Sequence, residues 1–227
     1  MNHTTRIISL ATALVATTAL TGCLRGGAST ADPAALAEAF LSARAEANTM
    51  LMENTTLPDT GGGTYSGTAL GMIKQSSNSE QVGTHWAGDA SFEVAFATND
   101  ATFDGSITGI IARADTDQRD AYTLYYNGTQ EEITEYLEGF DSTTGSIQIT
   151  NGRLSPQSFN ANYVSSEISG GFNHNGSDYQ FGGTGRGYFF GSNADGLNVN
   201  AETNDGLTIT ENGTTRAGDF GATTIRE

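Results

Sequence analysis

From Thr64 to the end of the sequence, apolar side chains recur at every second position, and this alternation constrains the fold more than any other feature. Phe92, Val94 and Phe96 form the clearest set, and shorter sets follow between turns rich in Gly, Asn and Asp. A period of two gives a segment one buried and one solvated face, which is typical of an antiparallel sheet. Many short strands joined by such turns predict a β-sandwich or a closed β-barrel.

Glycine inside the expected strands indicates strong curvature. The chain has 29 glycines, and Gly105 and Gly109 lie on the face that we expect Phe103, Ile107 and Ile111 to share. A glycine within a strand loses entropy on folding and has no side chain to pack, so its repeated use needs a structural reason. Tight bends at the corners of a barrel are one such reason.

The charge of the chain limits the partners that it can bind. Lys and Arg number 10 against 26 Asp and Glu, which gives a formal net charge of −16. Binding to nucleic acid depends on basic patches that contact phosphates, and the sequence has none, so we exclude this class. A single cysteine likewise excludes an intramolecular disulfide framework and a cysteine-based zinc site.

The N-terminus is typical of a secretion signal. Residues 7–20 are apolar or small, a run too short to span a bilayer as a helix, which takes about 20 apolar residues, but suited to a signal peptide. The run ends in the sequence LTGC, which resembles the lipobox of bacterial lipoproteins and contains the only cysteine, Cys23. We therefore expect a signal peptide at 1–22, lipidation at Cys23 and a lipid-anchored tether at 23–31. Leu24 after the cysteine favours the outer membrane, by resemblance to the sorting rule of enteric bacteria.

A helix is expected over residues 32–56, ahead of the strands. Asp32 and Pro33 suit an N-cap and the first helical position. Apolar residues then recur at three- and four-residue steps as far as Glu53, which indicates one apolar face. That face consists of Leu36, Phe40, Ala43, Ala47, Met50 and Leu51. We expect it to pack against the barrel or a neighbouring loop rather than against a partner helix.

The stretch at about 113–141 departs from the alternation and is strongly acidic. Its first apolar residues are interpreted as a strand that ends at an Asn127-Gly128 turn: Tyr122, Leu124 and Tyr126. Thr129 and Glu132 match a capping box and predict a short helix. The apolar side of that helix carries Ile133, Leu137 and Phe140. We interpret the stretch as an exposed acidic insertion within a barrel domain at 57–227.

Segments spread over residues 57–224 share a likeness to known proteins. Residues 57–61 (LPDTG) and 64–69 (TYSGTA) match an entry strand, and 187–194 (GYFFGSNA) is the most recognisable run. The other segments, in order, are 88–96, 104–109, 145–149, 158–161 and 217–222. Together they resemble the transferrin-binding protein B-like barrel lipoproteins. The resemblance implies an all-β fold, an eight-stranded antiparallel β-barrel, here preceded by the short amphipathic N-terminal helix.

The resemblance also implies a function in binding. Relatives are surface or outer-membrane lipoproteins that bind host iron or haem proteins, or complement regulators, largely through loops. Small eight-stranded barrels are filled by side chains or hold one small ligand. The inward candidates are large enough to fill one: Phe92, Phe96, Phe103 and Ile107. We therefore expect recognition on exposed loops and on the acidic insertion, not in a deep pocket.

The candidate partner-binding residues are acidic and favour a cationic partner. They are Asp115, Asp117, Asp120, Glu131, Glu132 and Glu135. Without Arg6 of the signal peptide, the mature chain would carry 9 basic and 26 acidic residues, a net charge of −17. Surface acidity that serves solubility alone is the alternative interpretation.

No set of residues assembles into a recognisable active site, so we predict no enzymatic activity and no cofactor. The His85-Trp86 pair would suit haem ligation and stacking, but an ordinary loop pair is the preferred interpretation. The aspartates at 115–120 suggest a calcium loop, but Arg119 takes a ligand-like position and the EF-hand glycine is missing.

The sequence thus predicts a lipid-anchored lipoprotein of the outer membrane that acts as a binding module and faces either the cell surface or the periplasm. Its ligand would be a partner protein or an iron- or haem-related molecule. The alternative hypothesis is a structural envelope lipoprotein without a specific ligand, and a hydrolase with an unrecognised site is a third.

Replacing Cys23 with serine (Cys23→Ser) should release the protein from membranes, because the thiol that carries the lipid is lost. Each buried acyl CH₂ contributes roughly 0.8 kcal/mol to membrane binding. We expect the variant to move from the membrane fraction to the soluble fraction and to incorporate no labelled fatty acid. A variant that stays with the membranes and still carries the label would show that Cys23 is not the anchor.

Overall fold

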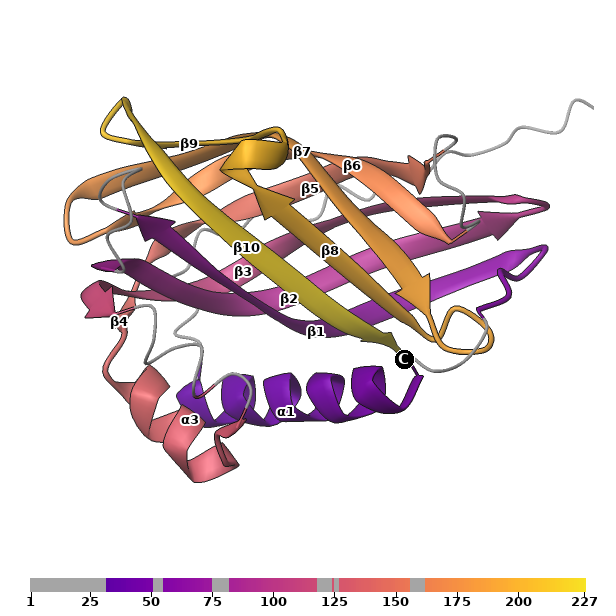
Figure 1. The fold of residues 1–227 in the computed structure, drawn as a ribbon, viewed down its shortest axis with the longest axis horizontal. Helices are drawn as coiled ribbons and strands as arrows, with labels where there is room; N and C mark the ends of the chain where they lie inside the picture. The colour runs from indigo at the N-terminus through magenta and orange to yellow at the C-terminus, as the bar shows by residue number, and fades with distance from the viewer. Residues whose placement is uncertain (1–31, 51–54, 75–81, 118–123, 125–126, 156–161) are drawn as a thin grey trace, which may run out of the picture.

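The computed structural model describes residues 32–50, 55–74, 82–117, 124, 127–155 and 162–227, and these form a closed barrel with helices on its outer side (Figure 1). The helices and strands are α1 (Pro33–Met50), β1 (Gly61–Lys74), β2 (Val82–Ala97), β3 (Asp100–Asp117), α3 (Gln130–Glu138), β4 (Asp141–Ser142), β5 (Thr144–Leu154), β6 (Tyr163–His174), β7 (Ser177–Phe190), β8 (Gly196–Glu202), the 3₁₀ turn η1 (Thr203–Asp205), β9 (Leu207–Glu211) and β10 (Thr214–Arg226). Among the described residues, no helix has the length and apolar character needed to cross a membrane.

The barrel has eight strand positions, each antiparallel to its neighbours. Their order is β1-β2-β3-β5-β6-β7-β8-β10, and β10 pairs back with β1 to close the sheet. β8 and β9 occupy successive halves of one position between β7 and β10, separated by η1. The short β4 lies just before β5, and both pair with β3. The predicted all-β fold, an eight-stranded antiparallel barrel preceded by a short helix, is confirmed.

Aromatic side chains fill the interior of the barrel. Near one end, the Trp86 ring lies 5.9, 5.8 and 5.7 Å from the rings of Phe172, Phe181 and Phe220. The predicted inward residues Phe92, Phe96, Phe103 and Ile107 all belong to the same core. Their burial confirms the alternation on which the prediction depended, and the interior is occupied by the protein's own side chains.

Ile111 does not share the inward face with Phe103 and Ile107 as expected. Gly109 has a φ of +57°, and the pairing of β2 with β3 shifts register at this point, which marks a β-bulge. The extra residue turns Ile110 into the barrel and Ile111 outward, where it packs in a second cluster beneath the helices. A strand pattern read without the bulge therefore gives the wrong face for Ile111.

α1 begins as the sequence predicts. The Asp32 carboxylate accepts a hydrogen bond from the Ala34 N–H at 3.0 Å, and Pro33 is the first helical residue. Leu36, Ala37 and Ala43 are buried, and the first two pack in the second cluster with barrel residues. The helix is described as far as Met50, and residues 55–58 are not helical, so the expected helix of 32–56 ends earlier.

The acidic stretch after β3 contains a docked helix. Thr129 and Glu132 form the predicted capping box: the Glu132 N–H donates to Thr129 Oγ1, and the Thr129 N–H donates to the Glu132 carboxylate. Ile133 and Leu137 are buried against α1 and the barrel. The stretch is therefore packed on one side rather than simply exposed.

The strand predicted before that helix is wrong where the structure describes it. Leu124 and Asn127 are helical, and the Gly128 N–H donates to the Leu124 carbonyl at 2.8 Å. The other two residues of the predicted strand, Tyr122 and Tyr126, lie outside the described residues. An Asn-Gly pair predicts a turn from local preferences, but here it follows helical residues instead.

Gly71→Ala should destabilise the barrel, because the indole of Trp86 occupies the space of a side chain at Gly71. A Cβ atom there would lie 2.5 Å from Cε2 of Trp86. Overpacking of this kind costs about 1–3 kcal/mol of unfolding free energy. Urea denaturation followed by the fluorescence of Trp86, the only tryptophan, measures the loss.

Gly182→Ala is the matched control for that substitution. A Cβ at Gly182 would meet only Thr208 Oγ1, at 3.1 Å, which is the end of a side chain that can rotate. We expect a much smaller loss than for Gly71→Ala. Equal losses in the two variants would mean that the contact with Trp86 is not what requires glycine.

Candidate functional site

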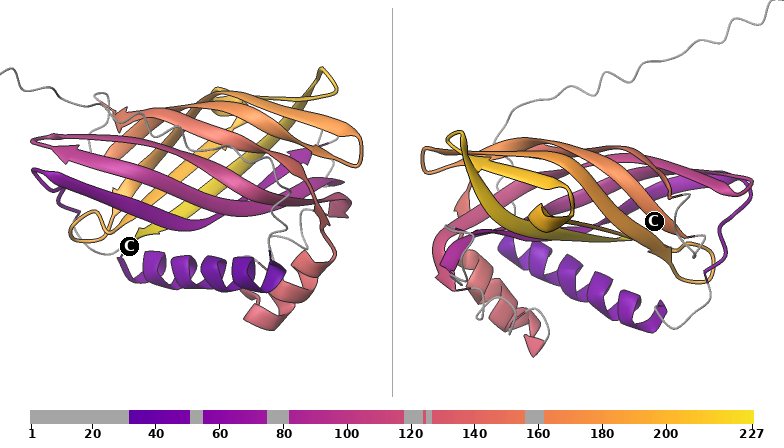
Figure 2. Two further views of the ribbon diagram at one scale, coloured as in Figure 1. Left: turned by 180° about the vertical axis from the view of Figure 1, so that it is seen from behind. Right: turned by 45° about the horizontal axis from the view of Figure 1, so that its top comes forward.

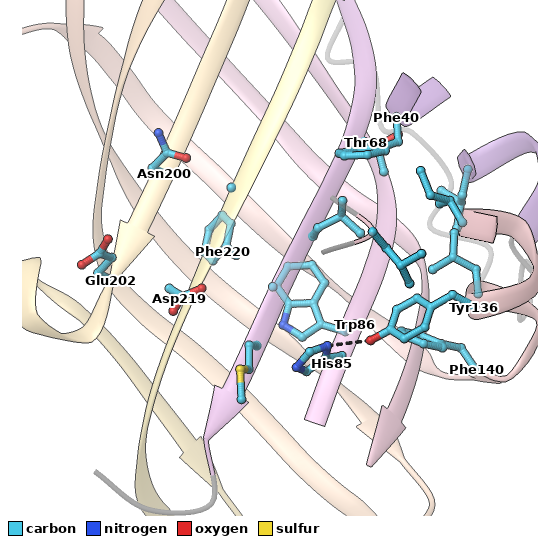
Figure 3. A pocket seen from close by; sticks show the side chains of 18 residues that line it. Phe40, Thr68, His85, Trp86, Tyr136, Phe140, Asn200, Glu202, Asp219 and Phe220 are labelled. Atoms are coloured by element: carbon cyan, nitrogen blue, oxygen red, sulfur yellow. Dashed lines mark hydrogen bonds between the residues drawn. The ribbon is translucent and has the colours of Figure 1, made fainter. Parts of the chain in front are cut away.

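A cavity of about 380 Å³ lies between the helices and the outer wall of the barrel (Figure 3). Figures 1 and 2 show that α1 and α3 lie together on the same side of the barrel. The cavity lining comes from both helices, from the segment before α3 and from β1, β2, β8 and β10. The residues are Leu36, Phe40, Thr68, Leu70, Gly71, Met72, His85, Trp86, Leu124, Ile133, Tyr136, Leu137, Phe140, Asn200, Glu202, Asp219, Phe220 and Gly221.

The cavity exists because the helices touch the barrel over a limited area. α1 packs against α3 on one side and against β1, β10 and β2 of the barrel on the other. A second hollow of about 350 Å³ lies farther along α1, next to Ala39, Ala43 and Ser66. A straight helix on a curved wall of small residues leaves such spaces beside it, since protein interiors otherwise pack closely.

One side of the cavity is apolar. Leu36 and Phe40 face it from α1, Ile133 and Phe140 from α3 and its end, and Leu70 from the outer face of β1. Pockets of about 300–1,000 Å³ with mostly apolar walls and a few polar groups are typical of small-molecule sites. The volume and the lining of this cavity both fall within that description.

His85 and Tyr136 join the barrel wall to α3 at the edge of the cavity. His85 is 5 % exposed, and its Nδ1 lies 2.8 Å from the Tyr136 hydroxyl, the contact drawn as a dashed line in Figure 3. The predicted loop pair at His85-Trp86 is wrong, because both residues lie within β2. Successive strand residues point to opposite faces, so His85 faces the helix while Trp86 lies in the barrel core. The two side chains therefore do not form one surface for haem.

Two carboxylates stand at the other side of the cavity. Asp219 on β10 and Glu202 on β8 are directly opposite each other in the strand pairing, and Figure 3 shows both on the side of β1 away from the helices. Burial raises the pKa of Asp219, Glu202 raises it further, and Lys74 opposes the shift. The described residues supply the Asp219 carboxylate with no hydrogen bond and no ion pair.

Two buried polar atoms on the lining have no hydrogen-bond partner in the described part of the chain. They are Oγ1 of Thr68, which is 4 % exposed, and Nε1 of Trp86, which is 1 % exposed. Leaving such an atom unsatisfied costs about 1–3 kcal/mol, so native proteins hold few of them. The indole of Trp86 lies in the barrel core, whereas Thr68 is on the outer face of β1, so the Thr68 hydroxyl is the one that a molecule in the cavity would satisfy.

The acidic residues predicted for partner binding come from β3, from α3 and from the segment between them. Asp115 and Asp117 lie at the end of β3, and Asp120 lies outside the described residues. Glu131, Glu132 and Glu135 are exposed on α3, and hydrogen bonds from Thr129 lower the pKa of Glu132. Within the described ranges, no group of three or more His, Cys, Asp or Glu residues is placed to hold a metal ion. Cys23 also lies outside those ranges.

The sequence predicts recognition on exposed loops and no deep pocket, so the cavity is a feature that it does not reveal. Its lining comes from separate segments that only the closed sheet and the docked helices bring together. One signal was present in the sequence: Leu70 and Met72 put two apolar side chains on the outward face of β1. Apolar residues on a face expected to be solvated indicate that another element covers it.

Comparisons with protein-family models, with curated proteins and with solved structures found no match. The functional argument therefore depends on the chemistry of the residues around the cavity.

Asp219→Asn should stabilise the folded protein at neutral pH. The folded-state pKa of Asp219 is raised above its unfolded value of about 3.9. Below about pH 3.9 the carboxyl is protonated in both the folded and the unfolded state, and its contribution to the unfolding free energy is fully present. That contribution is lost as the pH rises through the folded-state pKa, because the buried group must then carry a charge. Asparagine stays neutral, so the variant should exceed the wild type in unfolding free energy at pH 7, and the difference should close below about pH 3.9.

Urea denaturation at a series of pH values tests this prediction. Asp59→Asn makes the same change in charge at an exposed position and should show no such pH-dependent gain. Equal stability of Asp219→Asn and wild type at pH 7 would contradict the assignment of a destabilising buried carboxylate.

Proposed function

We propose that this protein is a lipid-anchored lipoprotein of the bacterial outer membrane, exposed at the cell surface, whose barrel acts as a binding module. The signal-like residues 1–22 and the lipobox at Cys23 support the anchor and the location. The likeness to transferrin-binding protein B-like barrels supports a role in binding. No catalytic activity is part of the proposal.

The single observation that carries the binding role is the cavity under α1 and α3. A structural lipoprotein needs neither a hollow of about 380 Å³ nor polar atoms left unsatisfied around it. Functional sites commonly keep groups that reduce stability, because those groups serve the ligand rather than the fold. Asp219 and Thr68 fit this pattern, since each is at least half-buried in the cavity wall without a hydrogen-bond partner among the described residues.

The proposed lipid anchor would also limit the distance between the cavity and the membrane. Residues 23–31 separate the proposed lipid from α1, and nine residues extend at most about 32 Å. Leu36 and Phe40 of the cavity belong to the first turns of α1. The helix-covered side of the barrel would therefore stay close to the membrane surface, where apolar small molecules are concentrated.

Native mass spectrometry of the full chain, purified from its own envelope in a mild detergent, tests the proposal. We expect a molecule of defined mass to remain bound. Gly221→Leu should reduce its occupancy at least tenfold, because this position on β10 lines the cavity and the nearest obstacle is the side-chain oxygen of Asn200 at 2.8 Å.

Gly182→Leu is the matched control, a strand glycine outside the cavity whose nearest neighbour is also a side-chain oxygen. It should retain the bound molecule. A wild-type protein that carries no small molecule and co-purifies only with abundant envelope components would instead support the structural role.

A further inference from the structure

We propose that the cavity binds an organic cation, a molecule with an apolar body and an ammonium group, and that Asp219 is its charged contact. This inference rests on the proposed binding function and names the class of ligand for the same site. It differs from an iron or haem ligand, for which the described residues provide no ligand cluster.

The charges on the lining favour a cation. Asp219 and Glu202 contribute two carboxylates, and none of the lining residues is lysine or arginine. The carboxylates are cross-strand partners, and like charges directly opposite each other destabilise a sheet. An ammonium group placed between them would relieve this repulsion and supply the hydrogen bonds that the described residues do not give to Asp219.

The spacing of the polar groups along the cavity wall limits the length of the ligand's apolar body. Met72 lies opposite Asp219 in the pairing of β1 with β10, and Thr68 lies four residues earlier on β1. Four residues of a strand extend about 13 Å, so the unpaired Thr68 hydroxyl stands about that far from the carboxylates along the wall. Leu70 lies between Thr68 and Met72 on the same outer face of β1 and gives this stretch of the wall an apolar surface.

An anion is disfavoured by the same geometry. A carboxylate or phosphate would meet Asp219 and Glu202, and Lys74, whose charge acts on Asp219 but which does not line the cavity, balances only one of these two carboxylates. The whole chain has a net charge of −16, which repels anions at longer range. The charge and the shape of the cavity therefore both favour an amphiphilic cation over a fatty acid or a phospholipid headgroup.

Three water-soluble probes with the same apolar body test the inference: 4-phenylbutylamine, 4-phenylbutanol and 4-phenylbutyrate. The full chain, held in a nanodisc of neutral lipid, is titrated with each probe, and empty nanodiscs give the blank. Trp86 is the only tryptophan and lines the cavity, so its fluorescence reports occupancy, and calorimetry gives the affinity.

We expect the amine to bind at least tenfold more tightly than the alcohol, and the butyrate to bind most weakly. Asp219→Asn should remove most of the preference for the amine, and Glu202→Gln part of it. Asp59→Asn, an exposed site with the same charge change, should leave the preference intact. Gly221→Leu should weaken all three probes.

Three results would overturn the inference. They are equal affinity for amine and alcohol, tighter binding of the butyrate, and a preference for the amine that survives Asp219→Asn. In each of these cases the probes still bind, so the proposed binding function would stand while the class of ligand would be wrong. Failure of every probe would also overturn the inference, and the bound molecule sought by native mass spectrometry would then decide on the binding function separately.

Discussion

Pairing between the first and last strands of the sheet is the constraint on which the rest of the structure depends. β1 and β10 are in register from Tyr65 opposite Arg226 to Lys74 opposite Ala217. The C-terminus reinforces this seam, because Arg226 Nη2 donates to the Gly62 carbonyl at 2.7 Å and the Glu227 N–H donates to the Thr64 carbonyl at 3.0 Å. Closure leaves no free edge for pairing with other chains, and it fixes the volume that the interior side chains must fill.

Closure also determines where a ligand can be held. The interior is filled by aromatic rings, and Trp86 even takes the space that a side chain at Gly71 would need. A second molecule therefore has room only outside the wall, where a covering element encloses space against it. α1 contacts both strands of the seam and, with α3, provides that cover. The position of the cavity is thus a consequence of the filled barrel.

The polar groups of the cavity reduce the stability of the fold. Asp219 and Glu202 face each other across neighbouring strands, and Thr68 keeps a buried hydroxyl without a partner in the described residues. Apolar replacements at these positions would remove these costs. Their presence beside an apolar wall is the physical basis for proposing a binding role, and the sign of the two carboxylates is the basis for proposing a cation.

The sequence by itself predicted an antiparallel β fold, most of its strands and many of the residues in its core. Alternation at Phe92, Phe96, Phe103 and Ile107 identified core positions, since a strand side chain has only two directions to choose between. Local chemistry likewise identified the caps at Asp32 and Thr129, because a cap involves residues only a few positions apart. Only the tertiary structure decided the direction of Ile111, which depends on a bulge at Gly109. It also decided the meeting of Asp219 with Glu202 and of His85 with Tyr136, because these pairs depend on strand register and helix docking between distant segments, which no local pattern encodes.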